Sequence, residues 1–179
     1  MRIVLIRHFK VKHKFPHFCD SKNYDIEFLK YENADLIPNC LATSSNHFSI
    51  CYSSTSKRAK ETAKKVFKKK IITTNELSEV PIKAIFSTKL KIPFILWNIL
   101  NRIAWHFNSK NTPETKNQTK KRAIQFLSKL NKNEDKNILI VSHRFFLLTL
   151  QREILRMGFI GKKIFSPKNG KFYTFENKQ

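Results

Sequence analysis

Two histidines in this chain each follow directly on a short apolar run. Residues 3–6 lead into Arg7 and His8, and residues 138–142 lead into His143. Both runs are short and rich in β-branched residues, which predicts buried strands. Because ligands bind at the carboxyl ends of strands in open α/β sheets, we expect Arg7 and both histidines at one sheet edge. An imidazole there can act as a nucleophile, and a guanidinium can bind an anion.

A run of Ser and Thr at residues 53–56 comes next, and Arg58 follows it. Such residues cap helices, and the free N–H groups and dipole of a helix N-terminus favour negative charge. Arg58 in the first helical turn could hydrogen-bond two phosphate oxygens at once. Glu76 and Glu79 form a pair of carboxylates that follows a short expected strand. The residue types therefore predict an anion-binding site with two carboxyl groups nearby.

Together these motifs resemble the histidine phosphatase (phosphoglycerate mutase-like) superfamily. The matching segments are residues 5–8 (LIRH), 52–63 (YSSTSKRAKETA), 77–79 (LSE) and 140–143 (IVSH). The resemblance implies that His8 is the nucleophile that becomes phosphorylated and that Glu79 is the proton donor. Glu76, three residues upstream, is the alternative acid. It implies that the phosphoryl group is held by Arg7, Arg58 and His143.

The chemistry of this residue set agrees with the resemblance. A phosphomonoester is a dianion near neutral pH, so its pocket must concentrate positive charge. Two arginines and a histidine can supply that charge without a metal, and no carboxylate cluster suited to Mg²⁺ is evident. His8, His13 and His17 are spaced as zinc ligands can be, but no Cys or carboxylate motif accompanies them. We therefore expect no metal and no cofactor.

The sequence departs from the family pattern beside both histidines. Phe9 and Arg144 stand where the family has glycine, and Val11 and Lys14 stand where it commonly has Ser/Thr and Asn. Glycine allows close backbone approach to a ligand, so Phe9 puts the fit of the usual pocket in question. Arg144 either adds a cation to the pocket or faces solvent. These departures leave open a catalytically impaired, phosphate-binding scaffold.

The elements that must position these residues alternate between strand and helix. Further strands are expected over 47–52, 71–74 and 171–175. Helices are expected after 53–56, over 115–130, from about 145, and in a short stretch near 25–31 of an otherwise irregular segment 9–46. This alternation predicts an α/β fold, a three-layer α/β/α sandwich with a mainly parallel (mixed) central sheet, as in phosphoglycerate mutase-like proteins.

The organisation along the chain predicts a single domain over residues 1–179. Residues 80–112 are expected to form a small lid or cap. The apolar run 92–107 inside it is too short and too polar to span a bilayer, so we expect a core or lid helix.

The charge and the cysteine content of the chain bear on its binding partners and its location in the cell. The chain has 35 Lys+Arg and 13 Asp+Glu, a formal net charge of +22, which by itself suggests nucleic acid. The lysines are scattered, and the abundance of Lys, Asn, Ile and Phe fits A/T-rich codons, so we expect a solvated surface and no specific nucleic acid. Cys19, Cys40 and Cys51 form no CxxC pair, and no signal peptide is evident, which favours a cytoplasmic protein.

The expected activity is hydrolysis of a small phosphomonoester, because a short chain leaves little room for the large cap of a mutase. Ribazole phosphatases and protein phosphohistidine phosphatases of the family are both of similar size. Glu79 favours the former, since phosphohistidine has a good leaving group that needs no acid. The impaired scaffold and, on charge alone, a nucleic-acid-binding protein remain as alternatives.

Overall fold

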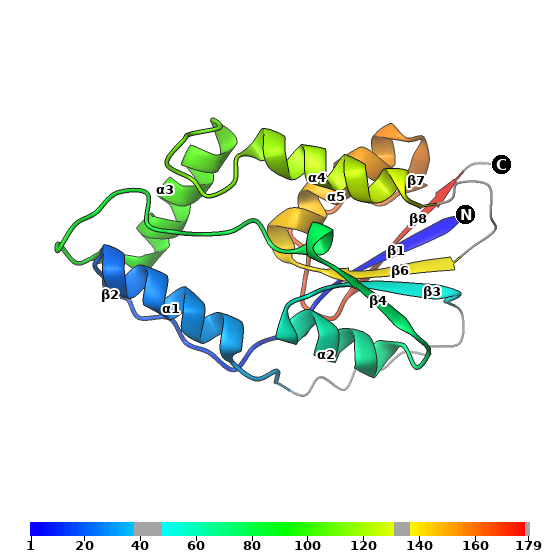
Figure 1. The fold of residues 1–179 in the computed structure, drawn as a ribbon, viewed down its shortest axis with the longest axis horizontal. Helices are drawn as coiled ribbons and strands as arrows, with labels where there is room; N and C mark the ends of the chain where they lie inside the picture. The colour runs from blue at the N-terminus through cyan, green and yellow to red at the C-terminus, as the bar shows by residue number, and fades with distance from the viewer. Residues whose placement is uncertain (38–47, 131–136, 178–179) are drawn as a thin grey trace.

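A six-stranded mixed sheet forms the centre of the computed structural model, which describes residues 1–37, 48–130 and 137–177 (Figure 1). In spatial order its strands are β4 (Ile71–Thr74), β3 (Ile50–Ser54), β6 (Asn137–Ser142), β1 (Arg2–Arg7), β8 (Phe172–Asn177) and β7 (Phe159–Gly161). The first four are mutually parallel, and β8 runs antiparallel to both of its neighbours. The expected α/β class with a mainly parallel, mixed sheet is confirmed.

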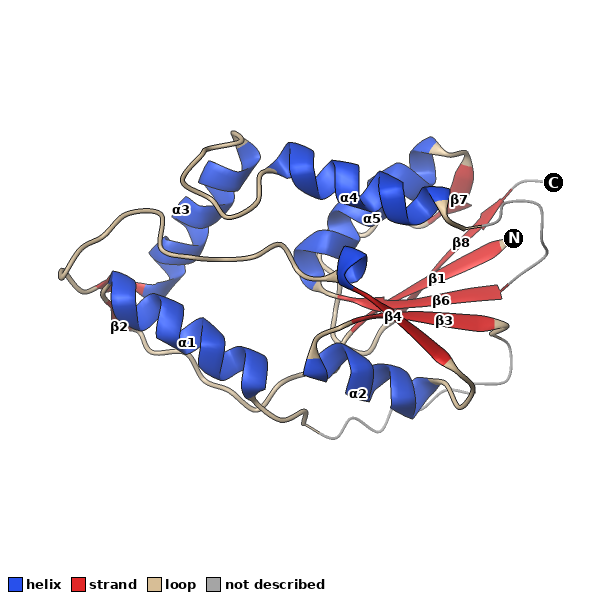
Figure 2. Ribbon diagram, viewed as in Figure 1, coloured by secondary structure: helices blue, strands red, loops and turns tan. Residues whose placement is uncertain are grey.

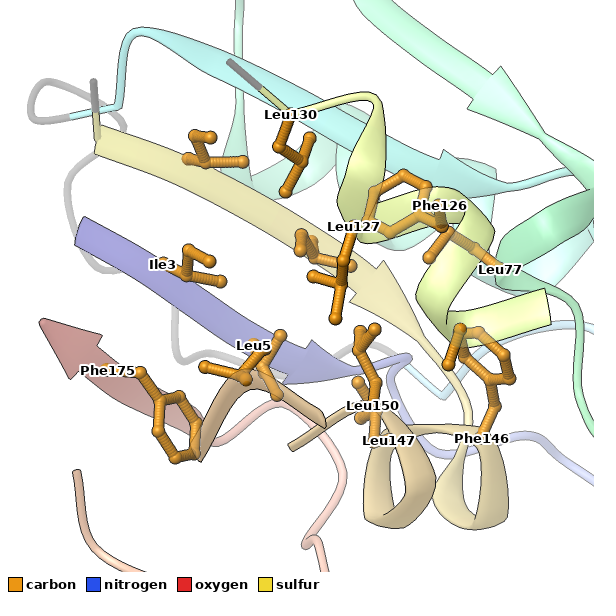
Figure 3. Packing of buried hydrophobic residues seen from close by; sticks show 14 of the residues in the cluster. Ile3, Leu5, Leu77, Phe126, Leu127, Leu130, Phe146, Leu147, Leu150 and Phe175 are labelled. Carbon is orange, nitrogen blue, oxygen red and sulfur yellow. The ribbon is translucent and has the colours of Figure 1, made fainter. Parts of the chain in front are cut away.

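Helices cover both faces of this sheet, which makes three layers (Figure 2). They are α2 (Lys57–Val66) on one face and α4 (Lys116–Ser128) and α5 (Arg144–Arg156) on the other. Alternate residues of β1 point to opposite faces, as the pleat of a strand requires. Ile3 and Leu5 join the core beneath α4 and α5, shown in Figure 3, whereas Val4 and Ile6 join the core beneath α2.

A smaller cluster lies beyond the carboxyl ends of the parallel strands. It contains α1 (Ser21–Asn33) and α3 (Phe94–His106), joined by the two-residue strands β2 (Phe18–Cys19) and β5 (Ile92–Pro93) (Figure 1). Tyr24, Phe94 and Trp97 form its buried centre. In the part of the chain that the structure describes, no helix is long and apolar enough to cross a membrane.

The expected elements are found with shifted ends. Residue 47, where the second strand was expected to begin, and Cys40 lie outside the described residues; the strand itself is Ile50–Ser54. The expected helix over 115–130 is Lys116–Ser128, with a capping box in which Thr115 and Gln118 bond each other's backbone. The short helix expected near 25–31 is longer than predicted, because α1 runs for 13 residues from an Asp20 cap, and residues 38–46 of the segment expected to be irregular lie outside the described residues. The short strands β2, β5 and β7 were missed.

Candidate active site

The two histidines meet because their strands are adjacent and in register. Arg7 of β1 pairs with Ser142 of β6, and the His8 amide donates to the Ser142 carbonyl at 3.0 Å. The imidazole centroids of His8 and His143 lie 5.1 Å apart. Both side chains are almost fully buried. The predicted meeting of Arg7 and both histidines at one sheet edge is therefore what the structure shows.

His8 is held as a neutral imidazole. Its Nδ1 lies 2.6 Å from the Phe9 carbonyl oxygen, which can only accept, so Nδ1 carries the proton and Nε2 keeps a lone pair. Burial first, and the charge of Arg58 next, lower the pKa of His8 to about 3. A neutral ring with an oriented lone pair is the form that a nucleophilic histidine requires.

His143 lies against the Ser/Thr turn that precedes α2. Its Nε2 is 2.9 Å from Ser54 Oγ and 3.2 Å from Ser56 Oγ. Burial, followed by the neighbouring His8 and Arg58, lowers the pKa of His143 well below its ordinary value. Ser56 also caps α2 by accepting from the Ala59 amide. The turn thus connects His143 to the helix N-terminus that the sequence predicted as an anion site.

The arginines hold unused hydrogen-bond donors at the same place. Arg58 is 4% exposed, and its Nε and Nη1 have no hydrogen-bond partner among the described residues. Arg7 donates from Nη1 to the Pro167 carbonyl at 3.2 Å, while its buried Nε is also without a partner in the described chain. Burial lowers the pKa of Arg7. Buried donors without acceptors are costly, so this arrangement is suited to an anion that supplies the acceptors.

One large cavity contains all the predicted site residues. Its volume is about 1490 Å³, and its lining includes Arg7, His8, Arg58, Glu79 and His143. Glu76 does not line it; its carboxylate instead pairs with Lys129 Nζ at 2.7 Å. Of the two candidate acids, the structure places Glu79 at the cavity.

Glu79 has one constrained oxygen and one freer oxygen. Oε1 accepts from the backbone amides of Val80 at 2.9 Å, Phe145 at 3.2 Å and Phe146 at 3.0 Å, whereas Oε2 shares only the Phe145 amide, at 3.3 Å. Phe145 and Phe146 open α5, so the carboxylate also lies at a helix N-terminus. The geometry orients the side chain through Oε1 and leaves Oε2 available for proton transfer.

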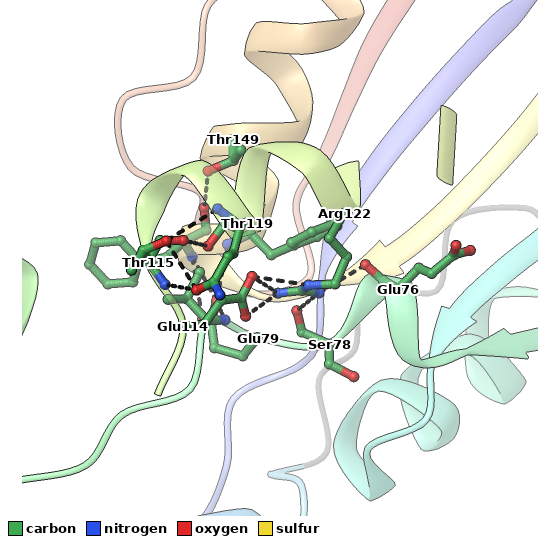
Figure 4. Close-up of polar contacts among 12 residues, drawn as sticks. Glu76, Ser78, Glu79, Glu114, Thr115, Thr119, Arg122 and Thr149 are labelled. Atoms are coloured by element: carbon green, nitrogen blue, oxygen red, sulfur yellow. Dashed lines mark hydrogen bonds and ion pairs between the residues drawn. The ribbon is translucent and has the colours of Figure 1, made fainter. Parts of the chain in front are cut away.

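Arg122 holds the loop that carries Glu79 (Figure 4). From α4 it donates to the carbonyls of Glu76 at 2.9 Å and Ser78 at 2.7 Å, and it forms a bidentate ion pair with Glu114. Its guanidinium also lies over the Phe146 ring, 4.4 Å from the centroid. Arg122 thus links α4, α5 and the acid-bearing loop.

Phe9 does not narrow the pocket. Its side chain is 1% exposed and packs in the core beneath α2 with Ala59 and Ala63. Its amide donates to Thr62 Oγ1 at 2.9 Å, and that hydroxyl donates to the Arg58 carbonyl at 2.7 Å. A side chain larger than that of glycine therefore fits at this position, because the Phe9 ring packs in the core and does not line the cavity.

Arg144 both adds a cation to the pocket and faces solvent, the two alternatives that the sequence left open. It lines the cavity, yet it is exposed, and its Nη2 donates to Ser166 Oγ at 3.2 Å. Val11 is buried at the cavity wall, whereas Lys14 is exposed.

Three residues at the site were missed from the sequence. The ring centroid of Tyr31, from α1, lies 4.9 Å from the guanidinium carbon of Arg58, and Tyr31 also lies near Arg7. Arg102 of α3 lies 3.5 Å from the Phe145 ring centroid, and burial lowers its pKa while nearby Glu79 opposes that shift. Asn169 donates to the His8 carbonyl at 2.7 Å. None of them belongs to a recognisable motif; only proximity in the fold reveals them.

The spacing of His8, His13 and His17 does not produce a metal site. His13 Nε2 instead lies 3.1 Å from Glu27 Oε2. Within residues 1–37, 48–130 and 137–177, no group of three or more His, Cys, Asp or Glu side chains could hold a metal ion.

Sequence comparison establishes the family. The chain belongs to the histidine phosphatase superfamily (branch 1), whose model matches residues 3–178. This membership supports a phosphatase as the class of enzyme. No curated protein matches the chain.

Solved structures share the fold. Phosphoserine phosphatase from Entamoeba histolytica, in complex with 3-phosphoglyceric acid, is 22% identical, with a TM-score of 0.59 over 99% of this chain and 98% of that chain. The α-ribazole phosphatase from Shigella flexneri is 17% identical, with a TM-score of 0.59 over 97% and 89%. Mycobacterial glucosyl-3-phosphoglycerate phosphatase is 14% identical, with a TM-score of 0.57 over 87% and 79%.

Proposed function

We propose that this protein hydrolyses a phosphomonoester through a phosphohistidine intermediate on Nε2 of His8. The observation that carries this proposal is the state of His8, a buried neutral ring whose Nδ1 is bonded to the Phe9 carbonyl. The unpaired donors of Arg7 and Arg58 beside it supply charge for the phosphoryl oxygens, and His143 completes this group.

The reaction has two steps in this proposal. Nε2 attacks phosphorus, the bond from phosphorus to the ester oxygen breaks, and Oε2 of Glu79 gives its proton to the departing alkoxide. Water then attacks the phosphohistidine, Glu79 takes up the proton, and inorganic phosphate leaves. Arginine charge stabilises the transferring group in both steps, so the proposal requires neither metal nor cofactor.

The position of Glu79 bears on the substrate. A carboxyl group that lines the cavity can assist an alkoxide, which is a poor leaving group, and this supports a small alkyl phosphate over a protein phosphohistidine. The burial of Phe9 in the core weakens the reason for considering an impaired scaffold. We also propose that residues 80–112, which include α3, act as a lid over the cavity of a single-domain cytoplasmic enzyme.

Trapping the intermediate tests this function. We expect brief exposure to substrate, in the presence of a metal chelator, to add one phosphoryl group to the peptide that contains His8. The adduct should be labile in acid and stable in alkali, and His8→Ala should lose both the adduct and several orders of magnitude in turnover. A label on Ser or Cys, or activity that needs an added metal, would contradict the mechanism.

A further inference from the structure

One face of α3 presents a row of apolar side chains to the cavity that contains His8. Ile95, Ile99 and Ile103 are spaced four residues apart, so they share one helix face, and Phe107 continues the row just past the helix end. These four side chains, called the α3 row below, are 66%, 48%, 49% and 77% exposed in that order. All four line the cavity.

The orientation of α3 is fixed by its opposite face. Phe94, Trp97 and Trp105 are buried there. The indole of Trp97 donates to the Cys19 carbonyl at 3.1 Å, and that of Trp105 donates to Thr119 Oγ1 at 3.0 Å. Because these contacts hold the helix, the α3 row cannot rotate into the interior of the protein. A continuous exposed apolar row is a frequent mark of a binding surface.

Other apolar groups face the same space. Phe15 and Phe28 line the cavity from the α1 side, and Val80, Pro81 and Ile82 line it along the chain that leaves Glu79. The groups proposed to hold the phosphate lie, by contrast, where the strands end, and polar residues of α3 such as Arg102 line the cavity as well. A phosphate group fills only a small part of about 1490 Å³, so the rest of the cavity is available to the organic part of a substrate.

We propose that the α3 row binds the leaving group of the substrate and that this leaving group is an extended apolar chain or ring. This inference rests on the proposed function, because the phosphate at His8 is what directs the organic group toward α3. Removing apolar surface of both partners from water would supply the binding free energy. Such a substrate combines a dianionic head, for the arginines and histidines at the strand ends, with an apolar body for the α3 row.

A series of straight-chain alkyl phosphates tests this proposal. Ethyl, butyl, hexyl and octyl phosphate leave alcohols of nearly equal acidity, so the chemical step stays constant while the apolar length changes. We expect kcat/KM of the wild type to rise about two- to fourfold per added methylene until the α3 row is covered. The double variant Ile99→Thr/Ile103→Thr should lose little on ethyl phosphate and at least about tenfold more on octyl phosphate.

A matched control is available on another helix. Ile124 of α4 is 46% exposed and does not line the cavity, so Ile124→Thr should leave the dependence on chain length unchanged. The proposal is overturned by a flat wild-type series or by equal losses of the double variant on all esters. A dimer of the wild type would also overturn the proposal under two conditions: light scattering shows that the double variant is a monomer, and the double variant keeps the wild-type dependence on chain length. A second copy of the chain would then cover the α3 row.

Binding measurements separate this inference from the proposed function. If no phosphomonoester is hydrolysed, including p-nitrophenyl phosphate, the proposed function fails. The affinity of non-hydrolysable alkylphosphonates, measured by calorimetry, still tests the α3 row. Affinity that rises with chain length in the wild type and less so in the double variant supports the row as a binding surface, whereas affinity independent of chain length overturns it.

Discussion

His8 and His143 lose their positive charge on burial, and this couples protonation to folding. The pKa of His8 falls from an ordinary value of 6.5 to about 3, and that of His143 also falls. Between about pH 6.5 and pH 3 the unfolded chain therefore binds a proton at His8 that the folded chain does not, and His143 acts in the same direction below pH 6.5. The stability that comes from keeping them neutral is fully present above pH 6.5 and declines as the pH falls through this window.

We therefore expect the free energy of unfolding to fall with decreasing pH by about 1 kcal/mol per pH unit for each such histidine. His8→Asn should reduce this slope, because one of the two groups no longer titrates. Urea unfolding at a series of pH values below 6.5 measures the slope. His106→Asn serves as control, since His106 is exposed, and it should retain the wild-type slope. Parallel slopes for wild type and His8→Asn would contradict the assignment of a buried neutral His8.

Glu79→Gln separates the chemical role of the side chain from its structural role. The amide oxygen can take the place of Oε1 and keep the bonds from Val80, Phe145 and Phe146, while the proton donor is lost. We expect turnover on alkyl phosphates to fall about 10²–10⁴-fold and turnover on p-nitrophenyl phosphate to fall far less. Steady-state kinetics of both substrates measures this, with Glu76→Gln as control. Equal losses on the two substrates would show that Glu79 only positions other groups.

At the scale of elements, the loop after β4 depends on α4 and α5 for its shape. Arg122 fixes its carbonyls from α4, and the first amides of α5 fix the Glu79 carboxylate. The loop has only the 3-10 turn Asn75–Leu77 as structure of its own. Its position is therefore determined by its neighbours rather than by local propensity.

Arg122→Lys tests this dependence. A lysine keeps the charge but cannot reproduce the planar set of donors that binds two carbonyls and a carboxylate at once. We expect kcat on alkyl phosphates to fall about tenfold or more, with a smaller loss on p-nitrophenyl phosphate, because misplacing the acid matters only where the acid is needed. Arg152→Lys, at an exposed position of α5, is the control. If Arg122→Lys lowers both activities equally, its effect is on the fold as a whole.

At the scale of the whole molecule, the net charge of +22 would attract the dianionic substrate that we propose. Cations that line the cavity or its rim include Lys10, Lys57, Arg102 and Arg144. Such a field attracts anions and raises the rate of productive encounter, and salt screens it.

We expect kcat/KM to fall about tenfold as ionic strength rises from about 0.02 M to about 0.5 M, while kcat changes less. Rates measured in chloride and in acetate salts distinguish screening from competition, because screening depends on ionic strength and not on the identity of the anion. Falls that differ strongly between the two salts, or no fall at all, would show that the surface charge does not contribute to substrate capture.

The sequence alone determined the sheet edge and the residues that meet there. Arg7, His8 and His143 follow strand-forming runs, and parallel strands bring their carboxyl ends to one edge. Arg58 follows a helix-capping turn, and Glu79 follows a strand. These relations are local, so residue type and spacing are enough to predict them.

Only the tertiary structure decided what surrounds this edge. Tyr31 and Arg102 come from α1 and α3, which are distant in sequence from the motifs and reach the cavity by packing around Tyr24 and Trp97. The direction of Phe9, toward the core and away from the cavity, also depends on the space that Ala59 and Ala63 leave beneath α2. Such contacts join residues far apart in the chain, and neither periodicity nor local propensity records them. The residues that meet at the sheet edge could thus be predicted from the sequence, while the other walls of the cavity could not.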